Sequence, residues 1–106
     1  MPKYLLHASY TAEGTKGLLK EGGSARRKSV VDLLTPLGGT LEAFYFTFGD
    51  EDAILIVDVP DVITGAALNL AVNASGTVRS HWTALLTVED IDEAARRSIP
   101  FRPPGK

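Results

Sequence analysis

The chain has 106 residues, of which 44% are hydrophobic and 23% charged, and its net charge is −2. This length suits one domain with one core, and the composition is that of a folded globular protein rather than a disordered one. The charge gives no broad basic surface, so binding to nucleic acid is disfavoured. We expect a single domain over residues 1–106, in which 98–106 form an extended tail.

Cysteine is absent from the sequence. Disulfides, thiolate nucleophiles and thiolate metal sites are therefore excluded, which fits a reducing compartment. The start of the chain lacks the pattern of a signal peptide, and no apolar run approaches the length of a membrane span. We expect a cytoplasmic protein with no membrane partner.

The first forty residues predict one strand followed by an interrupted helix. Apolar alternation over 4–10 indicates the strand, and Thr11 is a suitable N-cap for the helix that follows. Gly14 and Gly17 weaken that helix, and Gly22–Gly23 interrupts it. A second segment is expected over 25–37 with Ser24 as its N-cap, ended by the left-handed conformation that Gly38 and Gly39 favour.

Residues 40–61 predict a β-hairpin that turns at Gly49–Asp52 and ends at Pro60. Strict alternation along its first strand places Phe44, Phe46 and Phe48 on one face and Tyr45 on the other. The hairpin is therefore expected to be apolar on both faces.

The last third predicts a helix, a strand and a short helix. Asp61 is an N-cap for a helix through about Ser75, and a strand follows over 77–86. Thr87 and Asp90 form the pattern of a capping box for a helix ending near Arg97.

The element order predicts an α+β fold with a ferredoxin-like β-α-β-β-α-β antiparallel sheet and a C-terminal helix. Two helices would cover one face of the sheet. The other face would collect Leu5, His7, Ser9, Phe44, Phe46, Phe48, Ile54, Ile56, Asp58, Arg79, His81 and Thr83. That face is too apolar to remain in water, so we expect it to pack on the same face of a second copy.

Several segments resemble the GYD domain family of the dimeric α/β-barrel superfamily. They are KYLLHASYTAEGTKGLL, GGSARRK, the LGG before the hairpin, VDVPD after its turn, and SGTVRSHWTALLTVED. Gly49 and Asp52 match the family's turn, whereas Glu51 stands where the family has tyrosine. The resemblance implies a dimeric α/β barrel or a higher homo-oligomer, and it implies fold and assembly more than chemistry.

Four polar residues are expected on the apolar open face, namely His7, Asp58, Arg79 and His81. Such a cluster in an apolar cavity suits a small polar ligand or acid–base chemistry. The alternative is that these groups hydrogen-bond to one another and organise the interface, because buried polar groups need partners whatever their function. The two histidines with Asp58 are also a possible divalent metal site, although no local ligand spacing supports it.

Arg26 and Arg27, at the start of the second helical segment, are candidates for binding an anionic ligand or a carboxylate of a neighbouring subunit. A solvated helix face is the alternative.

We expect no cofactor, although haem, which the superfamily resemblance brings in, and a divalent metal stay open as alternatives. Two functional classes remain. One is a small-molecule enzyme or binder that uses a cavity on the open sheet face, and the other is an assembly or regulatory module without chemistry.

Overall fold

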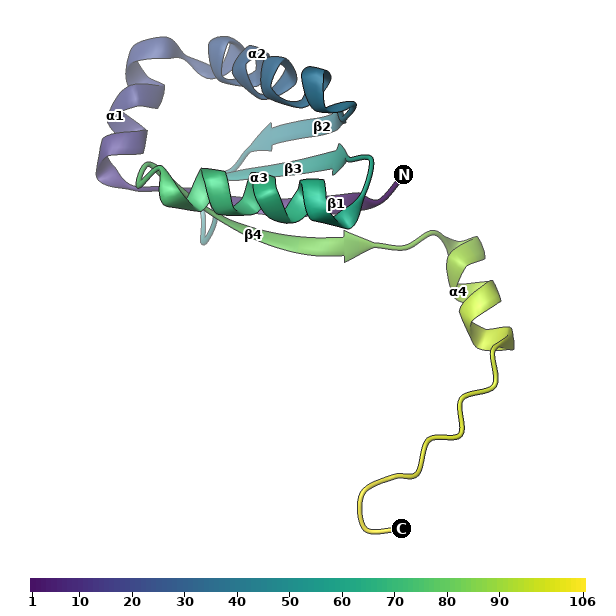
Figure 1. Cartoon of the computed structure of the whole chain (residues 1–106). Coiled ribbons are helices and arrows are strands. Elements are labelled where there is room, and N and C mark those ends of the chain that lie inside the picture. Colours follow the sequence, from purple (N-terminus) through teal and green to yellow (C-terminus); the bar gives the residue numbers. More distant parts are fainter.

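The computed structural model describes all 106 residues and forms one four-stranded sheet with four α-helices and a short 3₁₀ helix (Figure 1). The elements are β1 (Lys3–Tyr10), α1 (Ala12–Glu21), α2 (Gly23–Leu34), η1 (Thr35–Leu37), β2 (Thr40–Phe46), β3 (Ala53–Asp58), α3 (Val62–Ala74), β4 (Val78–Leu85) and α4 (Val88–Arg96). The predicted α+β class with an antiparallel sheet is confirmed.

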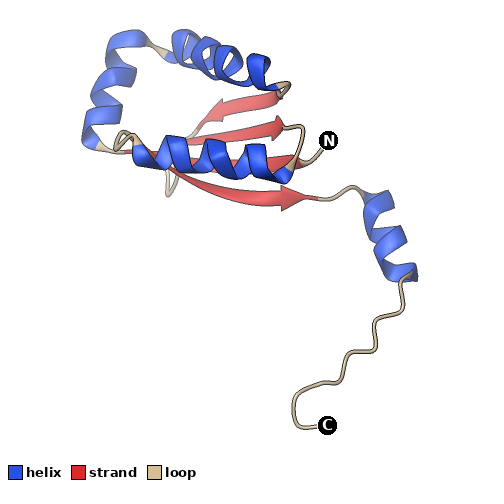
Figure 2. Cartoon of the chain, viewed as in Figure 1, coloured by secondary structure: helices blue, strands red, loops and turns tan.

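The strand order is β2-β3-β1-β4, and every neighbouring pair is antiparallel. The chain enters at the centre of the sheet, because β1 pairs with both β3 and β4. The hairpin of β2 and β3 extends the sheet on one side of β1, while β4 closes the other side (Figure 2).

The core lies on one face of the sheet, beneath α2 and α3. Residues of β3 alternate strictly between buried and half-buried, so only one face of this central strand is covered. Leu34 of α2 and Leu68 of α3 pack in the same cluster as that covered face. The buried hydrophobic residues are Leu6, Ala8, Leu34, Ala53, Leu55, Val57, Val59 and Leu68. Burial of each large side chain of this core stabilises the fold by on the order of 1.5–3 kcal/mol.

A β-bulge in β2 overturns the predicted faces of the hairpin. Leu41 pairs with Val57 and Ala43 pairs with Ile56, so Glu42 is an extra residue without an opposite partner. The alternation of side chains reverses after such a bulge.

Phe44 and Phe46 consequently face the helices, and Tyr45 faces the open side opposite Ile54. Phe48 is not in the strand at all and is fully exposed. The prediction that three phenylalanines line the open face is therefore wrong. The bulge lets both Leu41 and Phe44 pack against the core, which a regular strand of this sequence would not allow.

The helix interruption was predicted correctly, but its N-cap was not. Gly22 has a φ of 84°, a backbone conformation that residues other than glycine rarely adopt. The chain turns at this residue between α1 and α2. As a result α2 already begins at Gly23, and Ser24 lies inside the helix instead of capping it. At the other end Pro36 lies in η1, and Gly38 closes the segment in the left-handed conformation with a φ of 78°.

The other predicted caps are present. The side chains of Thr11 and Asp61 accept hydrogen bonds from the backbone N–H groups of Gly14 and Thr64, and Thr87 forms a capping box with Asp90. None of the helices combines the length and apolar character that crossing a membrane requires.

The two glycines of α1 differ in their surroundings, and this difference gives a test of the packing. A Cβ on Gly14 would lie 2.0 Å from the backbone oxygen of Thr77, whereas a Cβ on Gly17 would meet nothing within 4 Å. Alanine is favoured over glycine by about 1 kcal/mol in a helix. We expect Gly17→Ala to raise the free energy of unfolding by about 0.5–1 kcal/mol, and Gly14→Ala to lower it by about 1–3 kcal/mol. Urea denaturation measures both, and equal effects would contradict the close approach of α1 to Thr77, the residue before β4.

The cap of α3 predicts a pH dependence. The pKa of Asp61 is lowered, chiefly because the Thr64 backbone N–H donates to its carboxylate at 2.7 Å. A lowered folded-state pKa stabilises the fold above the unfolded pKa, and this stabilisation is lost as pH falls through the folded value. The melting temperature of Asp61→Ala should therefore lie below that of the parent chain near pH 7, and the gap should shrink below about pH 4. Asp50→Ala, which removes an exposed turn carboxylate, is the control and should show no such gap.

Candidate functional site

The open face of the sheet is arranged in rows of cross-strand neighbours. One row runs from Tyr45 through Ile54 and His7 to His81, in the order β2, β3, β1 and β4. The next row holds Ala43, Ile56, Leu5 and Thr83. The histidine pair therefore lies beside apolar side chains near the middle of the face.

His7 and His81 are direct cross-strand partners, with ring centroids 6.3 Å apart and ring planes tilted by 55°. This confirms the predicted placement on adjacent strands. His7 is partly covered, and its Nδ1 atom is buried without a hydrogen-bond partner, whereas His81 is exposed. The pair thus consists of one sheltered and one accessible imidazole on the open face.

Glu51 is the carboxylate beside His7. Its Oε1 atom lies 4.0 Å from Nδ1 of His7, and its Oε2 atom accepts a hydrogen bond from Ser9 Oγ at 3.3 Å. The hairpin turn carries Glu51 back to the end of β1, because the Asp52 N–H donates to the Ala8 carbonyl at 2.9 Å and the Asp52 carboxylate accepts from the Tyr10 N–H. Arg79 lies opposite Ser9 on β4 and is exposed.

Asp58 does not join this group. It lies opposite Lys3, four residues from His7 along β1, which corresponds to about 13 Å of strand. The amine of Lys3 donates to both Glu42 and Asp58, and its pKa is raised mainly by Glu42 and further by Asp58. The proposed grouping of Asp58 with the histidines is wrong, because the long pitch of a strand separates residues that share a face.

Asp58 also lies too far from the two histidines to share a metal ion with them within one chain. No three histidine, aspartate or glutamate side chains gather as potential metal ligands in the structure.

Arg26 and Arg27 lie on the other side of the sheet. Arg26 lines a cavity beneath the helices and lies 3.6 Å from Glu21, and Arg27 borders a shallow hollow with Phe44 and Phe46. Neither arginine reaches the histidines. The six candidate residues are thus divided among the two faces and the far end of the sheet.

Two polar groups of the site were missed in the sequence. Strand alternation places Ser9 on the open face but gives it no role, and the sequence places Glu51 in the hairpin turn. Glu51 could have been noticed in the sequence because it replaces the tyrosine of the family's turn pattern. Only the folded hairpin shows that its carboxylate approaches β1.

Asn69 and Asn73 have a structural role. Nδ2 of Asn73 donates to Oδ1 of Asn69, and Oδ1 of Asn73 accepts from the backbone N–H of Ser80 at 2.7 Å. The two amides therefore attach α3 to β4 and do not face the open side.

A family model described as the GYD domain matches residues 4–95. The chain belongs to the GYD domain family. Neither a curated protein nor a solved structure shows a significant match to the chain. The matched range of this GYD domain runs from the second residue of β1 through most of α4, so it includes both histidines, Glu51 and all of the sheet except Lys3.

Proposed function

We propose that this GYD domain is the subunit of a homo-oligomer in which two open sheet faces pack together and enclose a site for a small polar molecule. The observation that carries the proposal is the pair of adjacent histidines with Glu51 and Arg79, beside apolar residues on a sheet face that has no helix over it. The strand order supports a ferredoxin-like subunit of this kind, which would form a dimeric α/β barrel.

The apolar residues of the open face support the pairing. Leu5, Ile54 and Ile56 are only half-buried, and Tyr45 is 69% exposed. A second copy would remove this surface from water, and a two-fold axis would bring the same face of the two copies together.

The C-terminal arm, residues 88–106, supports assembly independently. It comprises α4 and the tail, and it extends away from the sheet and the other helices (Figure 1). The radius of gyration is accordingly 16.9 Å, against about 13 Å for a compact chain of this length. Val88, Ile91, Ile99 and Phe101 of the arm are all exposed, so the arm has apolar side chains to bury on a neighbouring subunit.

The polar cluster suits a ligand that carries a carboxylate or phosphate group. Arg79 is a permanent cation with several donors, and histidine changes its charge near neutral pH, so His81 and Arg79 together offer donors to an anion. Glu51 beside His7 provides an acceptor for the remainder of the molecule. An acid–base reaction would use the same groups, since imidazole is the usual proton carrier at neutral pH.

The second candidate function is an assembly module without chemistry. The pairing of Ser9 with Glu51 and of Lys3 with Glu42 and Asp58 favours it, because these groups already satisfy one another within the chain. In that case the histidines would only fix how two faces meet.

The interface is tested by placing a charge on the open face. Ile56→Asp should dissociate the oligomer, because a carboxylate between two paired apolar faces would lack a partner. Light scattering on a sizing column at low micromolar concentration gives the mass directly. The matched control is Ile63→Asp, which alters an exposed isoleucine of α3 on the helix side and should leave the mass unchanged. A parent chain that is monomeric under these conditions would contradict the proposed assembly.

The site is tested by His81→Ala. The His81 side chain is exposed and makes no hydrogen bond within the chain, so its removal should change the melting temperature by only a few degrees and leave the oligomer intact. A thermal-shift screen of small carboxylates and phosphates should yield a ligand for the parent chain. At a hundred times its dissociation constant, such a ligand adds about 2.7 kcal/mol of stability, and His81→Ala should abolish that gain. Dissociation of the oligomer by His81→Ala would instead show that the histidines are structural and would favour the assembly module.

A further inference from the structure

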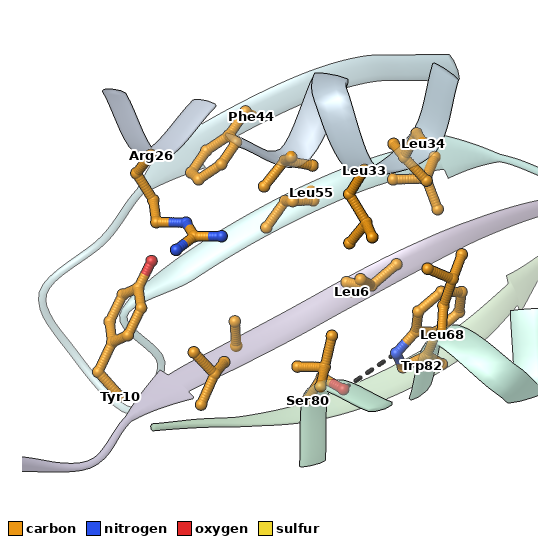
Figure 3. Close-up of a pocket in the computed structure, with 15 residues that line it drawn as sticks. Leu6, Tyr10, Arg26, Leu33, Leu34, Phe44, Leu55, Leu68, Ser80 and Trp82 are labelled. Carbon is orange, nitrogen blue, oxygen red and sulfur yellow. Dashed lines mark hydrogen bonds between the residues drawn. The ribbon is translucent and has the colours of Figure 1, made fainter. Parts of the chain in front are cut away.

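A cavity of about 100 Å³ lies between α2, α3 and the covered face of the sheet, on the opposite side from the histidines. Thirteen of its fifteen lining residues are hydrophobic, so most of its wall offers no hydrogen bond. Leu33 and Leu34 of α2 and Leu68 of α3 line it above the strands (Figure 3). The two helices cover different parts of the sheet and leave this space between them.

The cavity has one polar end. Tyr10 and Arg26 lie at that end, with the phenol and the guanidinium pointing toward one another, while Trp82 and Leu68 lie at the other end (Figure 3). The indole of Trp82 donates to Ser80 Oγ at 3.0 Å, so the polar groups at the far end already have partners. Tyr10 and Arg26 make no side-chain hydrogen bond, and Arg26 has only the ion pair with Glu21 at 3.6 Å.

Both groups at the polar end act as donors. A guanidinium has no acceptor, and burial raises the pKa of Tyr10, so its hydroxyl keeps its proton at neutral pH. A ligand oxygen that accepts hydrogen bonds would therefore satisfy both groups.

The charges around this end select a neutral acceptor. Beyond Tyr10 and Arg26 the cavity adjoins a hollow beside α1 that is also lined by Glu13 and Glu21. Glu21 already balances the charge of Arg26, and Glu13 adds a second negative charge. A carboxylate would be repelled by both glutamates, whereas a carbonyl oxygen would accept hydrogen bonds without displacing Glu21.

We propose that this cavity binds a small apolar molecule of about one aromatic ring that carries a neutral carbonyl group, with the carbonyl oxygen held by Arg26 and Tyr10. Its volume of about 100 Å³ is about two-thirds of the ~150 Å³ of a closed cavity that holds benzene, so only part of the molecule fits inside and the rest extends into the adjoining hollow. The cavity shares Tyr10, Arg26 and Val78 with the hollow beside α1, so the carbonyl end of the molecule is placed toward that hollow and the ring toward Trp82. The proposal is independent of the open face and of the oligomer.

The experiment uses the single tryptophan of the chain as a reporter. Trp82 lines the cavity, so its indole N–H signal in a ¹H–¹⁵N spectrum should shift when the cavity is filled. Acetophenone, phenylacetate and ethylbenzene have similar size and carry a ketone, a carboxylate and no acceptor, respectively. We expect acetophenone to shift the signal at the lowest concentration. Absence of any shift at millimolar acetophenone, or tighter binding of phenylacetate, would overturn the proposal.

Substitutions at the polar end test the role of the donors. Arg26→Met should weaken acetophenone binding by about tenfold or more, because hydrogen bonds to charged donors are the stronger ones, and should leave ethylbenzene binding unchanged. Tyr10→Phe, which keeps the ring, should weaken acetophenone binding in the same direction by a smaller factor. Arg27→Met is the matched control, since Arg27 does not line the cavity, and it should have no effect on either probe. Equal effects of Arg26→Met and Arg27→Met, or full acetophenone affinity in Tyr10→Phe, would contradict the assigned roles.

Discussion

One layer of helices must cover a sheet that has apolar side chains on both faces, and the rest of the structure follows from this constraint. The layer covers the face of Leu6, Leu55 and Val57, and these residues form the core with Leu34 and Leu68. The other face keeps Ile54 and Ile56 next to two histidines, with no element of the same chain over them. The helix layer therefore fixes both the monomer core and the surface that we propose for assembly.

The bulge at Glu42 decides how the aromatic residues of the hairpin are shared between the two faces. It moves Phe44 and Phe46 to the helix side and Tyr45 to the open side. The core gains the ring of Phe44, and the open face gains a phenol that can both pack and form hydrogen bonds. The open face is consequently less apolar than a regular strand would have made it, which suits an interface that also carries His7, His81 and Glu51.

The two proposed sites differ in chemistry because they lie on opposite faces of the same strands. Residues of β1 alternate between them, since His7 and Ser9 face the open side while Tyr10 faces the cavity. The open face offers acid–base groups near solvent or a partner, and the cavity offers an apolar wall with two donors at one end. A ligand of one site has no reason to bind at the other.

The sequence by itself determined the local structure well and the placement of polar groups only in part. The caps at Thr11, Asp61 and Thr87, and the left-handed turn at Gly38, depend on a few neighbouring residues, so they could be predicted. The meeting of His7 and His81 followed from the predicted strand order. The reversal after Glu42, the separation of Asp58 from the histidines and the approach of Glu51 could not be predicted, because they depend on register and on where the hairpin closes. The placement of Arg26 beside Tyr10 likewise required the helices to be set on the sheet, since residues sixteen positions apart meet only through tertiary packing.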